Sequence, residues 1–325
     1  MAEQAIIIET HGGPEAMSLR DITLPPPCEG EVRVRHSAIG LNFIDMYHRS
    51  GLYPVALPSG LGMEAAGTVE AVGPGVAGLA VGDRVASFTG ALGAYATARN
   101  VAAMHLARLP DGVSDEVAAA AILKGCTTEA LIERCARVQA GDWVLVHAAA
   151  GGMGLLLTQW LKHIGARVIG VVSTAAKAEK SRAAGADHVL VLTADSIAEA
   201  VRDLTGGDGV AVTFDGVGKD TWAASLKATR RRGLIISYGN ASGPVTGIGL
   251  AELASAGSLF VTRPTMFDYY REPAEREAGI ARVMHMLSGG VLSVDIGQRY
   301  PLADAAQAHR DLADRRTTGS TILIP

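Results

Sequence analysis

The chain has 325 residues, of which 48% are hydrophobic and 19% charged, so it can bury a large core and is not expected to be disordered. Its length suits about two domains at roughly 150 residues each. The net charge of −4 gives no electrostatic reason to expect a nucleic-acid or membrane partner. The three cysteines do not make a disulfide framework, and no apolar run suits a signal peptide or a membrane span, so a cytoplasmic protein is expected.

The first part of the chain, up to about Leu109, is predicted to be mainly β. Three segments, EVRVRHSAIG, GTVEAVG and GDRVASF, are alternating or β-branched in pattern and are bounded by glycine. Proline and glycine clusters separate them as loops. This pattern indicates a compact all-β or partly open barrel domain.

From Asp142 onward, predicted strands and helices alternate. The expected strands are Trp143–His147, Arg167–Val172, His188–Leu192, one within Val210–Gly218, one within Gly233–Asn240, and Ser258–Thr262. Helical segments separate the first four, which indicates βαβ units and a parallel sheet. The tail after Arg263 is predicted as helix, strand, helix, strand.

Small residues interrupt the apolar pattern between the first of these strands and its helix. Ala148, Gly151 and Gly154 form an A-x-x-G-x-x-G pattern where the strand ends and the helix begins. Such residues let the backbone turn tightly and approach a pyrophosphate, while the helix N-terminal amides supply donors. The pattern predicts a dinucleotide site in a doubly wound, Rossmann-type domain. A close strand–helix turn without a ligand is the structural alternative.

The end of the second strand predicts which dinucleotide is bound. An NAD-preferring site usually carries an acid there for the ribose 2′-hydroxyl. This chain has Ser173 and Lys177 instead, with no acid before Glu179. A hydroxyl and a cation suit a 2′-phosphate, so NADPH is favoured over NADH. A solvated lysine in the first helical turn is the alternative reading of Lys177.

The sequence offers no separate catalytic group. Neither the cysteines nor the nine histidines show the spacing of a zinc site, so no metal is expected. A G-x-S-x-G motif is absent, which argues against an α/β-hydrolase. The chemistry is therefore expected to come from the cofactor, as hydride transfer.

Several motifs together resemble the quinone oxidoreductase (zeta-crystallin-like) family, the zinc-free branch of the medium-chain dehydrogenases/reductases. They are NFIDMYHRSGLYP, PSGLGMEAAGTVEAVGPGV, HAAAGGMG and AHRDLADRRTTGSTILIP, in chain order. The resemblance implies a discontinuous, mainly β GroES-like catalytic domain, residues 1–125 and 263–325, around a Rossmann domain, residues 126–262. It also implies NADPH-dependent reduction of a quinone, and a homodimer or tetramer, of which the dimer is expected.

The resemblance assigns roles to individual residues. Asn42, Tyr47 and Tyr53 are implied to act at the nicotinamide and quinone end of the site. The implied cofactor contacts are Thr127, Ala150, Gly151, Gly152, Met153, Gly154, Ser173, Lys177, Tyr238, Asn240 and Arg315. Tyr47 and Tyr53 as packing residues, and Arg315 as a solvated cation, are the alternative readings.

Two departures from relatives bear on metal and cofactor binding. Where zinc-dependent relatives have GHE and a cysteine, this chain has Met63 and Asp45, and methionine is a poor zinc ligand. Leu192 and Gly216 stand where relatives carry a tyrosine and a serine. Their loss is expected to weaken NADPH affinity or the preference over NADH.

The mechanism expected from these residues is direct hydride transfer to a planar acceptor, with Asn42 and a tyrosine as donors to the developing oxyanion. Reduction of an enone or 2-alkenal is the alternative within the enzymes. A zinc alcohol dehydrogenase is a further enzyme alternative that the motifs disfavour. A non-catalytic NADPH- or RNA-binding, crystallin-like role is the alternative from another class. The basic runs at Arg230–Arg232 and Arg315–Arg316 are short and lack interleaved aromatics, which disfavours RNA binding.

Overall fold

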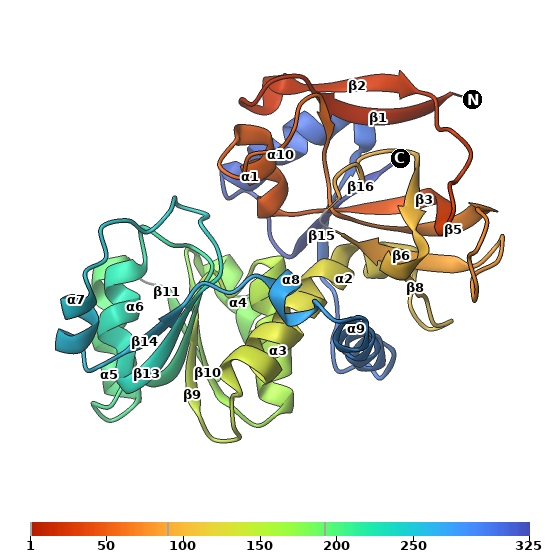
Figure 1. Cartoon of the computed structure of the whole chain (residues 1–325). Helices are drawn as coiled ribbons and strands as arrows, with labels where there is room; N and C mark the ends of the chain where they lie inside the picture. Colours follow the sequence, from red (N-terminus) through yellow and green to blue (C-terminus); the bar gives the residue numbers. More distant parts are fainter. Residues whose placement is uncertain (1, 90, 192) are drawn as a thin grey trace. The chain divides into compact units, whose positions relative to one another are not determined.

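The computed structural model describes residues 2–89, 91–191 and 193–325 and divides the chain into two compact units (Figure 1). Unit 1 comprises Met1–Lys124, Val283–Ser288 and Val294–Pro325, and unit 2 comprises Gly125–Arg282 and Gly289–Ser293. Residues 263–282 therefore pack with unit 2, whereas the resemblance placed them in the catalytic domain. The units are defined by packing alone, so the domain boundaries of the family stay a prediction.

Unit 2 contains a six-stranded, fully parallel sheet in the order β11-β10-β9-β12-β13-β14. Its strands are β9 (Trp143–Val146), β10 (Arg167–Val172), β11 (His188–Val191), β12 (Val210–Asp215), β13 (Thr229–Ser237) and β14 (Phe260–Thr262). Numbered along the chain, this is the 3-2-1-4-5-6 order of the dinucleotide-binding fold. The predicted Rossmann-type sheet is confirmed, and the expected strand end at Leu192 lies outside the described residues.

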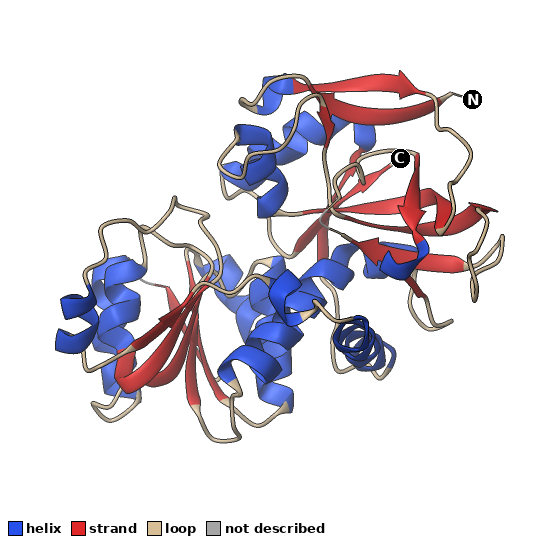
Figure 2. Ribbon diagram, viewed as in Figure 1, coloured by secondary structure: helices blue, strands red, loops and turns tan. Residues whose placement is uncertain are grey.

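Helices cover both faces of this sheet (Figure 2). They are α3 (Gly152–His163), α4 (Ala175–Ala183), α5 (Ala194–Leu204), α6 (Trp222–Ala228), and the shorter α7 (Leu250–Ser255) and α8 (Met266–Tyr269). Because both faces are covered, the central strands are largely apolar, and every residue of β12 is buried. Gly165 and Gly185 follow α3 and α4 at φ 85° and 103°, the left-handed conformation in which glycine commonly ends a helix.

Unit 1 is mainly β, as expected, and its strands form two sheets. The strands are β1 (Glu3–Ile8), β2 (Met17–Ile22), β3 (Glu31–Leu41), β4 (Ser59–Gly60), β5 (Glu64–Val72), β6 (Arg84–Phe88), β7 (Ala98–Ala102), β8 (Leu106–Arg108), β15 (Ile296–Pro301) and β16 (Ser320–Ile324). One sheet has the order β2-β1-β4, and the other β15-β16-β3-β5-β6-β8, with β7 also paired to β3. The last strand, β16, thus lies inside the larger sheet, between β15 and β3.

Helices α1 (Phe43–Ser50) and α10 (Ala305–Ala313) belong to unit 1. Helix α2 (Asp115–Glu129) begins in unit 1 and continues in unit 2 as a π-helix, Ala130–Ala136, and α9 (Pro273–Ser288) likewise contributes to both. Single turns of 3₁₀-helix occur at Pro14–Ala16, Ala103–His105 and Leu302–Asp304. The helices of the described residues all fall short of what a bilayer span requires in length and apolarity.

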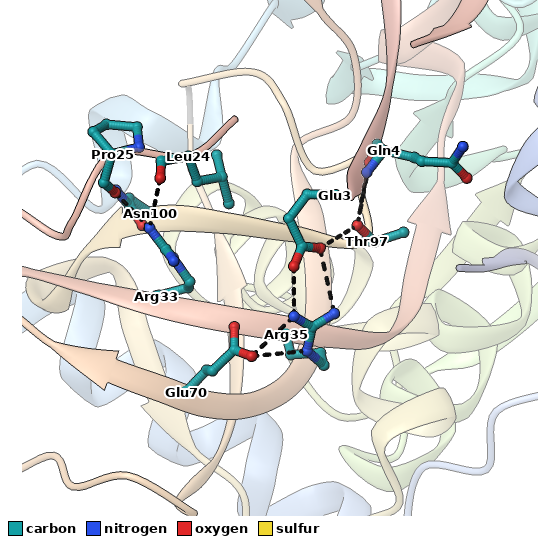
Figure 3. A network of polar contacts seen from close by, with 9 residues as sticks. All are labelled: Glu3, Gln4, Leu24, Pro25, Arg33, Arg35, Glu70, Thr97 and Asn100. Carbon is teal, nitrogen blue, oxygen red and sulfur yellow. Dashed lines mark hydrogen bonds and ion pairs between the residues drawn. The ribbon is translucent and has the colours of Figure 1, made fainter. Parts of the chain in front are cut away.

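A polar network joins β1 to the larger sheet of unit 1 (Figure 3). Arg35 on β3 donates to Glu3 at 2.6 Å and to Glu70 on β5 at 2.9 Å. Thr97 also donates to Glu3, at 2.6 Å. The Arg35 and Thr97 hydrogen bonds lower the pKa of Glu3 against the opposing effect of its burial. Their stabilising effect is therefore present above the ordinary carboxyl pKa and is lost as pH falls.

Arg35→Gln is expected to lower the free energy of unfolding at pH 7 by about 1 kcal/mol, because the arginine side chain is half exposed and solvent screens its ion pairs. Denaturant unfolding at low and high salt measures this, and the deficit should shrink at high salt. Arg20→Gln is the matched control, since the Arg20–Glu9 pair is more exposed on both sides. Equal effects of the two substitutions would contradict the prediction.

Candidate active site and dinucleotide site

The turn from β9 into α3 has the backbone of a phosphate-binding loop. Ala148 follows the strand at φ 52°, and its carbonyl accepts the Gly151 amide at 3.0 Å. Gly151 is the N-cap of α3, and no described side chain caps that helix. The first amides of α3 therefore have no intrahelical acceptor, and with the helix dipole they favour an anion.

The two glycines of the turn differ in the space around them. A Cβ on Gly154 would lie 2.4 Å from the Ala148 oxygen and 2.6 Å from the Ala149 Cα, so the helix packs directly on the turn. A Cβ on Gly151 would meet nothing closer than 3.4 Å. Gly154 is thus required by packing, whereas Gly151 keeps room that a ligand's phosphates can fill. This cradle fits the pyrophosphate of a dinucleotide.

The end of β10 carries hydroxyls and a lysine. Ser173 is exposed, and Lys177 lies in the first turn of α4, half-buried. The Thr174 hydroxyl accepts the Lys177 amide at 3.3 Å and so caps α4. The first acid after β10 is Glu179, and it forms an ion pair with Arg182. The described residues at this strand end therefore include no carboxylate, which would repel a 2′-phosphate.

Asp215, at the end of β12, holds the next loop in place. It is buried, and its carboxylate accepts the amides of Val217 and Gly218, both at 2.9 Å. It also accepts hydroxyls from Thr221 at 2.8 Å and Ser225 at 2.7 Å. Sequence reasoning did not assign Asp215 a role, although an acid closing a buried strand before two glycines was a usable signal.

Tyr238 packs on this loop. A Cβ on Gly216 would lie 2.7 Å from Cζ of the Tyr238 ring, so Gly216 leaves the room that the ring uses. The Tyr238 amide donates to the Asp215 carbonyl at 2.9 Å. A serine at 216 would displace the tyrosine, so the position of the Tyr238 ring depends on the absence of a side chain at Gly216. How this changes NADPH affinity stays a prediction.

The remaining predicted cofactor residues lie in different surroundings. Asn240 accepts a hydrogen bond from Arg263 at 3.1 Å, and Arg263 also donates to the Gly239 carbonyl at 2.9 Å. The Thr127 hydroxyl contacts the Met266 sulfur at 3.6 Å within unit 2. Arg315 belongs to unit 1 and follows α10 with φ 59°.

The predicted catalytic residues of unit 1 lie on or beside α1. Asn42 is the N-cap of α1 and is 9% exposed. The Tyr47 ring meets Tyr53 edge to face, with centroids 5.2 Å apart, and the Tyr53 amide donates to the Tyr47 carbonyl at 3.1 Å. The structure thus brings all three residues to one helix and the turn that follows it.

Two buried carboxylates support this helix, and sequence reasoning assigned neither a role. Glu64 accepts the Asn42 side-chain amide at 2.7 Å and the Lys124 ammonium at 3.0 Å. Asp45 accepts the Asn42 backbone amide at 2.8 Å. Burial raises the pKa of Asp45 to about 7, against the lowering effect of its hydrogen bonds. The second oxygen of Asp45, Oδ1, is buried without a hydrogen-bond partner in the described structure.

A chain of hydrogen bonds ends on Asp45. Arg49 can only donate, so Nδ1 of His309, 3.0 Å away, is the acceptor. Burial and the Arg49 charge lower the pKa of His309 to about 3, so the ring is neutral and Nε2 carries its proton. Nε2 therefore donates to the Tyr95 oxygen at 3.0 Å, and the Tyr95 hydroxyl donates to Asp45 at 2.9 Å. While Asp45 is ionised, each hydrogen bond from Arg49 through His309 and Tyr95 to Asp45 thus has one direction.

Met63 and Asp45, at the two positions that the resemblance matched to zinc ligands of metal-dependent relatives, are both buried. Met63 is buried in an apolar position, and Asp45 accepts two hydrogen bonds through one oxygen. Within the described residues, no three His, Cys, Asp or Glu side chains lie as a metal-binding group. The expectation of metal-free chemistry continues to rest on the residue types.

Comparison with known proteins identifies both parts of the chain. The "Alcohol dehydrogenase GroES-like domain" family matches residues 28–111, and the "Zinc-binding dehydrogenase" family matches residues 152–278. A quinone oxidoreductase of Pseudomonas aeruginosa is 49% identical, with 97% of each chain covered. A 2-haloacrylate reductase of a Burkholderia species is 41% identical, covering 99% of this chain and 98% of that protein.

Among solved structures, the quinone oxidoreductase of Escherichia coli complexed with NADPH matches with a TM-score of 0.96 and 45% identity. The match covers 99% of this chain and 100% of that one. Full-length similarity at this identity shows the family. The chain belongs to the quinone oxidoreductase family of medium-chain oxidoreductases.

Proposed function

We propose that the protein transfers hydride from NADPH to a quinone without a metal. The observation that carries the proposal is the uncapped α3 N-terminus beside a β10 end that bears Ser173 and Lys177 and no acid. The names of its relatives agree: the Pseudomonas aeruginosa protein is a quinone oxidoreductase, and the Escherichia coli enzyme was solved with NADPH.

The cofactor-binding part of the proposal assigns each contact to unit 2 or to Arg315. The pyrophosphate is held by the segment Ala150–Gly154, and the 2′-phosphate by Ser173 and Lys177, because a cation and a hydroxyl pair with a phosphate dianion. The other proposed contacts are Thr127, Tyr238, Asn240 and Arg315. Asp215 is proposed to act through the loop that it holds, since its oxygens are already used inside the protein.

When bound, NADPH supplies the hydride, and the protein's part is to orient the acceptor and stabilise the charge that develops on its oxygen. Asn42 uses one side-chain N–H on Glu64 and keeps the second as a donor. Tyr47 and Tyr53 are proposed to contact the quinone with Asn42. A quinone needs little acid catalysis, because its own ring stabilises the reduced anion, and solvent can then protonate it.

Reduction of an activated double bond is a second candidate function. The 2-haloacrylate reductase relative, 41% identical, is the observation that favours it. Such a substrate must be protonated at carbon, so it demands closer proton delivery than a quinone does. An enal substrate therefore distinguishes this function from quinone reduction.

Assembly and location complete the proposal. We propose a homodimer that pairs through β14, because this strand is an edge of the parallel sheet and its Phe260 is 61% exposed. Cys28, Cys126 and Cys135 are all free thiols, which agrees with a reducing, cytoplasmic environment. Size-exclusion chromatography with light scattering tests the dimer, and Phe260→Glu should yield the monomer.

The function is tested by following NADPH and NADH oxidation at 340 nm with 1,4-benzoquinone, 9,10-phenanthrenequinone or 2-hexenal, in the presence of a chelator. Quinone-dependent NADPH oxidation that survives the chelator is expected. Turnover with the enal alone would move the function to double-bond reduction. Tight NADPH binding without oxidation would indicate a binding role, and loss of activity to the chelator would indicate zinc.

Lys177→Met is expected to raise KM for NADPH about tenfold and to leave KM for NADH within about twofold, because one charge-assisted contact to the 2′-phosphate contributes about 1.5 kcal/mol. Steady-state kinetics with both nucleotides measure this. Lys180→Met, one turn further along α4, is the matched control and should change neither value. Equal increases for NADPH and NADH would contradict the assignment.

A further inference from the structure

The Glu64 carboxylate accepts three hydrogen bonds, from Asn42 and from two adjacent residues of α2. Oε1 accepts Lys124 Nζ at 3.0 Å and Asn42 Nδ2 at 2.7 Å, and Oε2 accepts the Leu123 amide at 2.7 Å. The side chain of Glu64 is fully buried, and that of Lys124 is 8% exposed. Gly40 makes this arrangement possible, since a Cβ there would lie 2.2 Å from Oε1.

This geometry decides how the Asn42 amide is oriented. An asparagine amide can rotate by half a turn, which exchanges its donor and acceptor ends at little steric cost. An ionised carboxylate only accepts hydrogen bonds, so Asn42 must present Nδ2 to Glu64. Its Oδ1 and second N–H then face away from Glu64.

Lys124 keeps Glu64 ionised, so that Glu64 can only accept a hydrogen bond from Asn42. A buried carboxylate is costly unless a cation pairs with it, and without one it takes up a proton. Among the described residues, Lys124 from α2 forms an ion pair with Glu64, and Asp45 from α1 and Tyr95 also interact with it electrostatically. Lys124 is the only cation among these three. A protonated Glu64 could donate to Asn42, and the pairing would then no longer require Nδ2 to face Glu64.

We propose that Glu64 and Lys124 are positioning residues that fix the orientation of the Asn42 amide for reaction. The proposal rests on the proposed function, in which Asn42 contacts the reactants. Neither Glu64 nor Lys124 is assigned contact with substrate. Their effect passes through one side chain, so it should appear in kcat and in its pH dependence and be absent from NADPH binding.

The test is the pH profile of kcat for NADPH-dependent quinone reduction in Lys124→Met, from pH 6 to 9. A buried carboxyl group that has lost its cation favours the protonated form, and rising pH opposes that protonation. We expect kcat at pH 6.5 to fall at least tenfold relative to the parent protein and to recover as pH rises. KM for NADPH should stay within about twofold, and Lys124→Arg, which keeps the charge, should restore the parent profile.

A double-mutant comparison separates positioning from general stability. In an Asn42→Ala background, Lys124→Met should change kcat less than about twofold, because the side chain that it orients is absent. If Lys124→Met does not fold, Glu64→Gln replaces it: its amide can donate or accept, so kcat should again fall about tenfold with KM for NADPH unchanged.

The outcomes distinguish the inference from the function on which it rests. An inactive parent protein would overturn the proposed function. An active parent with a folded Lys124→Met variant of unchanged kcat and pH profile would overturn the positioning role, as would full additivity with Asn42→Ala.

Discussion

Gly154→Val should abolish measurable NADPH binding and destabilise unit 2 by about 3 kcal/mol, the upper end of the usual cost of overpacking. The atoms that a Cβ would meet, the Ala148 oxygen at 2.4 Å and the Ala149 Cα at 2.6 Å, belong to the backbone and cannot rotate away. Helix α3 must therefore move off the turn, and overpacking of this kind costs about 1–3 kcal/mol or more. Its N-terminal amides move with it, so the phosphate site is lost. Thermal unfolding and fluorescence titration with NADPH measure both effects.

Gly151→Ala is the matched control for this prediction. Its added methyl would meet only the Ala148 oxygen, at 3.4 Å, which is ordinary contact. The unfolding temperature should therefore stay within about 2 °C of the parent value, a change of about 0.5 kcal/mol or less. NADPH affinity should nevertheless fall about tenfold, because the methyl enters the room proposed for the pyrophosphate. Wild-type stability and binding in Gly154→Val would contradict the packing argument.

Asp45→Asn should make the protein more stable than the parent at pH 8 and should remove part of its pH dependence. Burial raises the pKa of Asp45 from 3.8 to about 7, so the folded state holds a proton that the unfolded state releases. This contribution is fully present below pH 3.8 and is lost as pH rises to 7. The stability difference between variant and parent should therefore grow by up to about 4 kcal/mol in favour of the variant.

Urea unfolding at one-unit steps from pH 4 to 8 measures this difference. Asn at position 45 keeps an acceptor for the Asn42 amide and the Tyr95 hydroxyl, so the fold should be retained. Asp187→Asn is the control of opposite sign. Burial opposes ionisation of Asp187, but hydrogen bonds from Lys162 and the Val168 amide lower its pKa overall. Its contribution is lost only below the ordinary range, so its deficit should be constant from pH 4 to 8. A constant difference for Asp45→Asn as well would refute the burial argument.

The dinucleotide-binding part was predictable from sequence because its signals are local. Each strand and helix there is one continuous segment, and the glycines that follow α3 and α4, Gly165 and Gly185, are visible in the sequence. The turn at Gly151 and Gly154 was identified by its spacing and by its place between a predicted strand and a predicted helix. The sequence could not distinguish the roles of the two glycines. The backbone atoms that crowd Gly154, and leave Gly151 open, lie there because of how α3 packs on the turn.

The supporting groups of Asn42 escaped prediction for a different reason. Tyr95 and His309 are 214 residues apart, and Arg49 and His309 are 260 apart, yet each pair is in hydrogen-bond contact. Periodicity and spacing carry no information over such separations. Glu64 and Lys124 were likewise 60 residues apart, each typical of a solvated surface when seen alone. Only the fold reveals them as a buried pair.

The position of β16 determines the order in which the two units can be completed during synthesis. Ile322 and Leu323 are completely buried, and their strand lies between β15 and β3 in the larger sheet of unit 1. During synthesis, β3 leaves the ribosome early but lacks one of its neighbours until about 280 further residues have been added. Unit 2 is nearly contiguous and is complete first. Unit 1, whose first strands are made before unit 2, is therefore finished after it, and a nascent chain stalled just before Ser320 would carry an open sheet edge in unit 1.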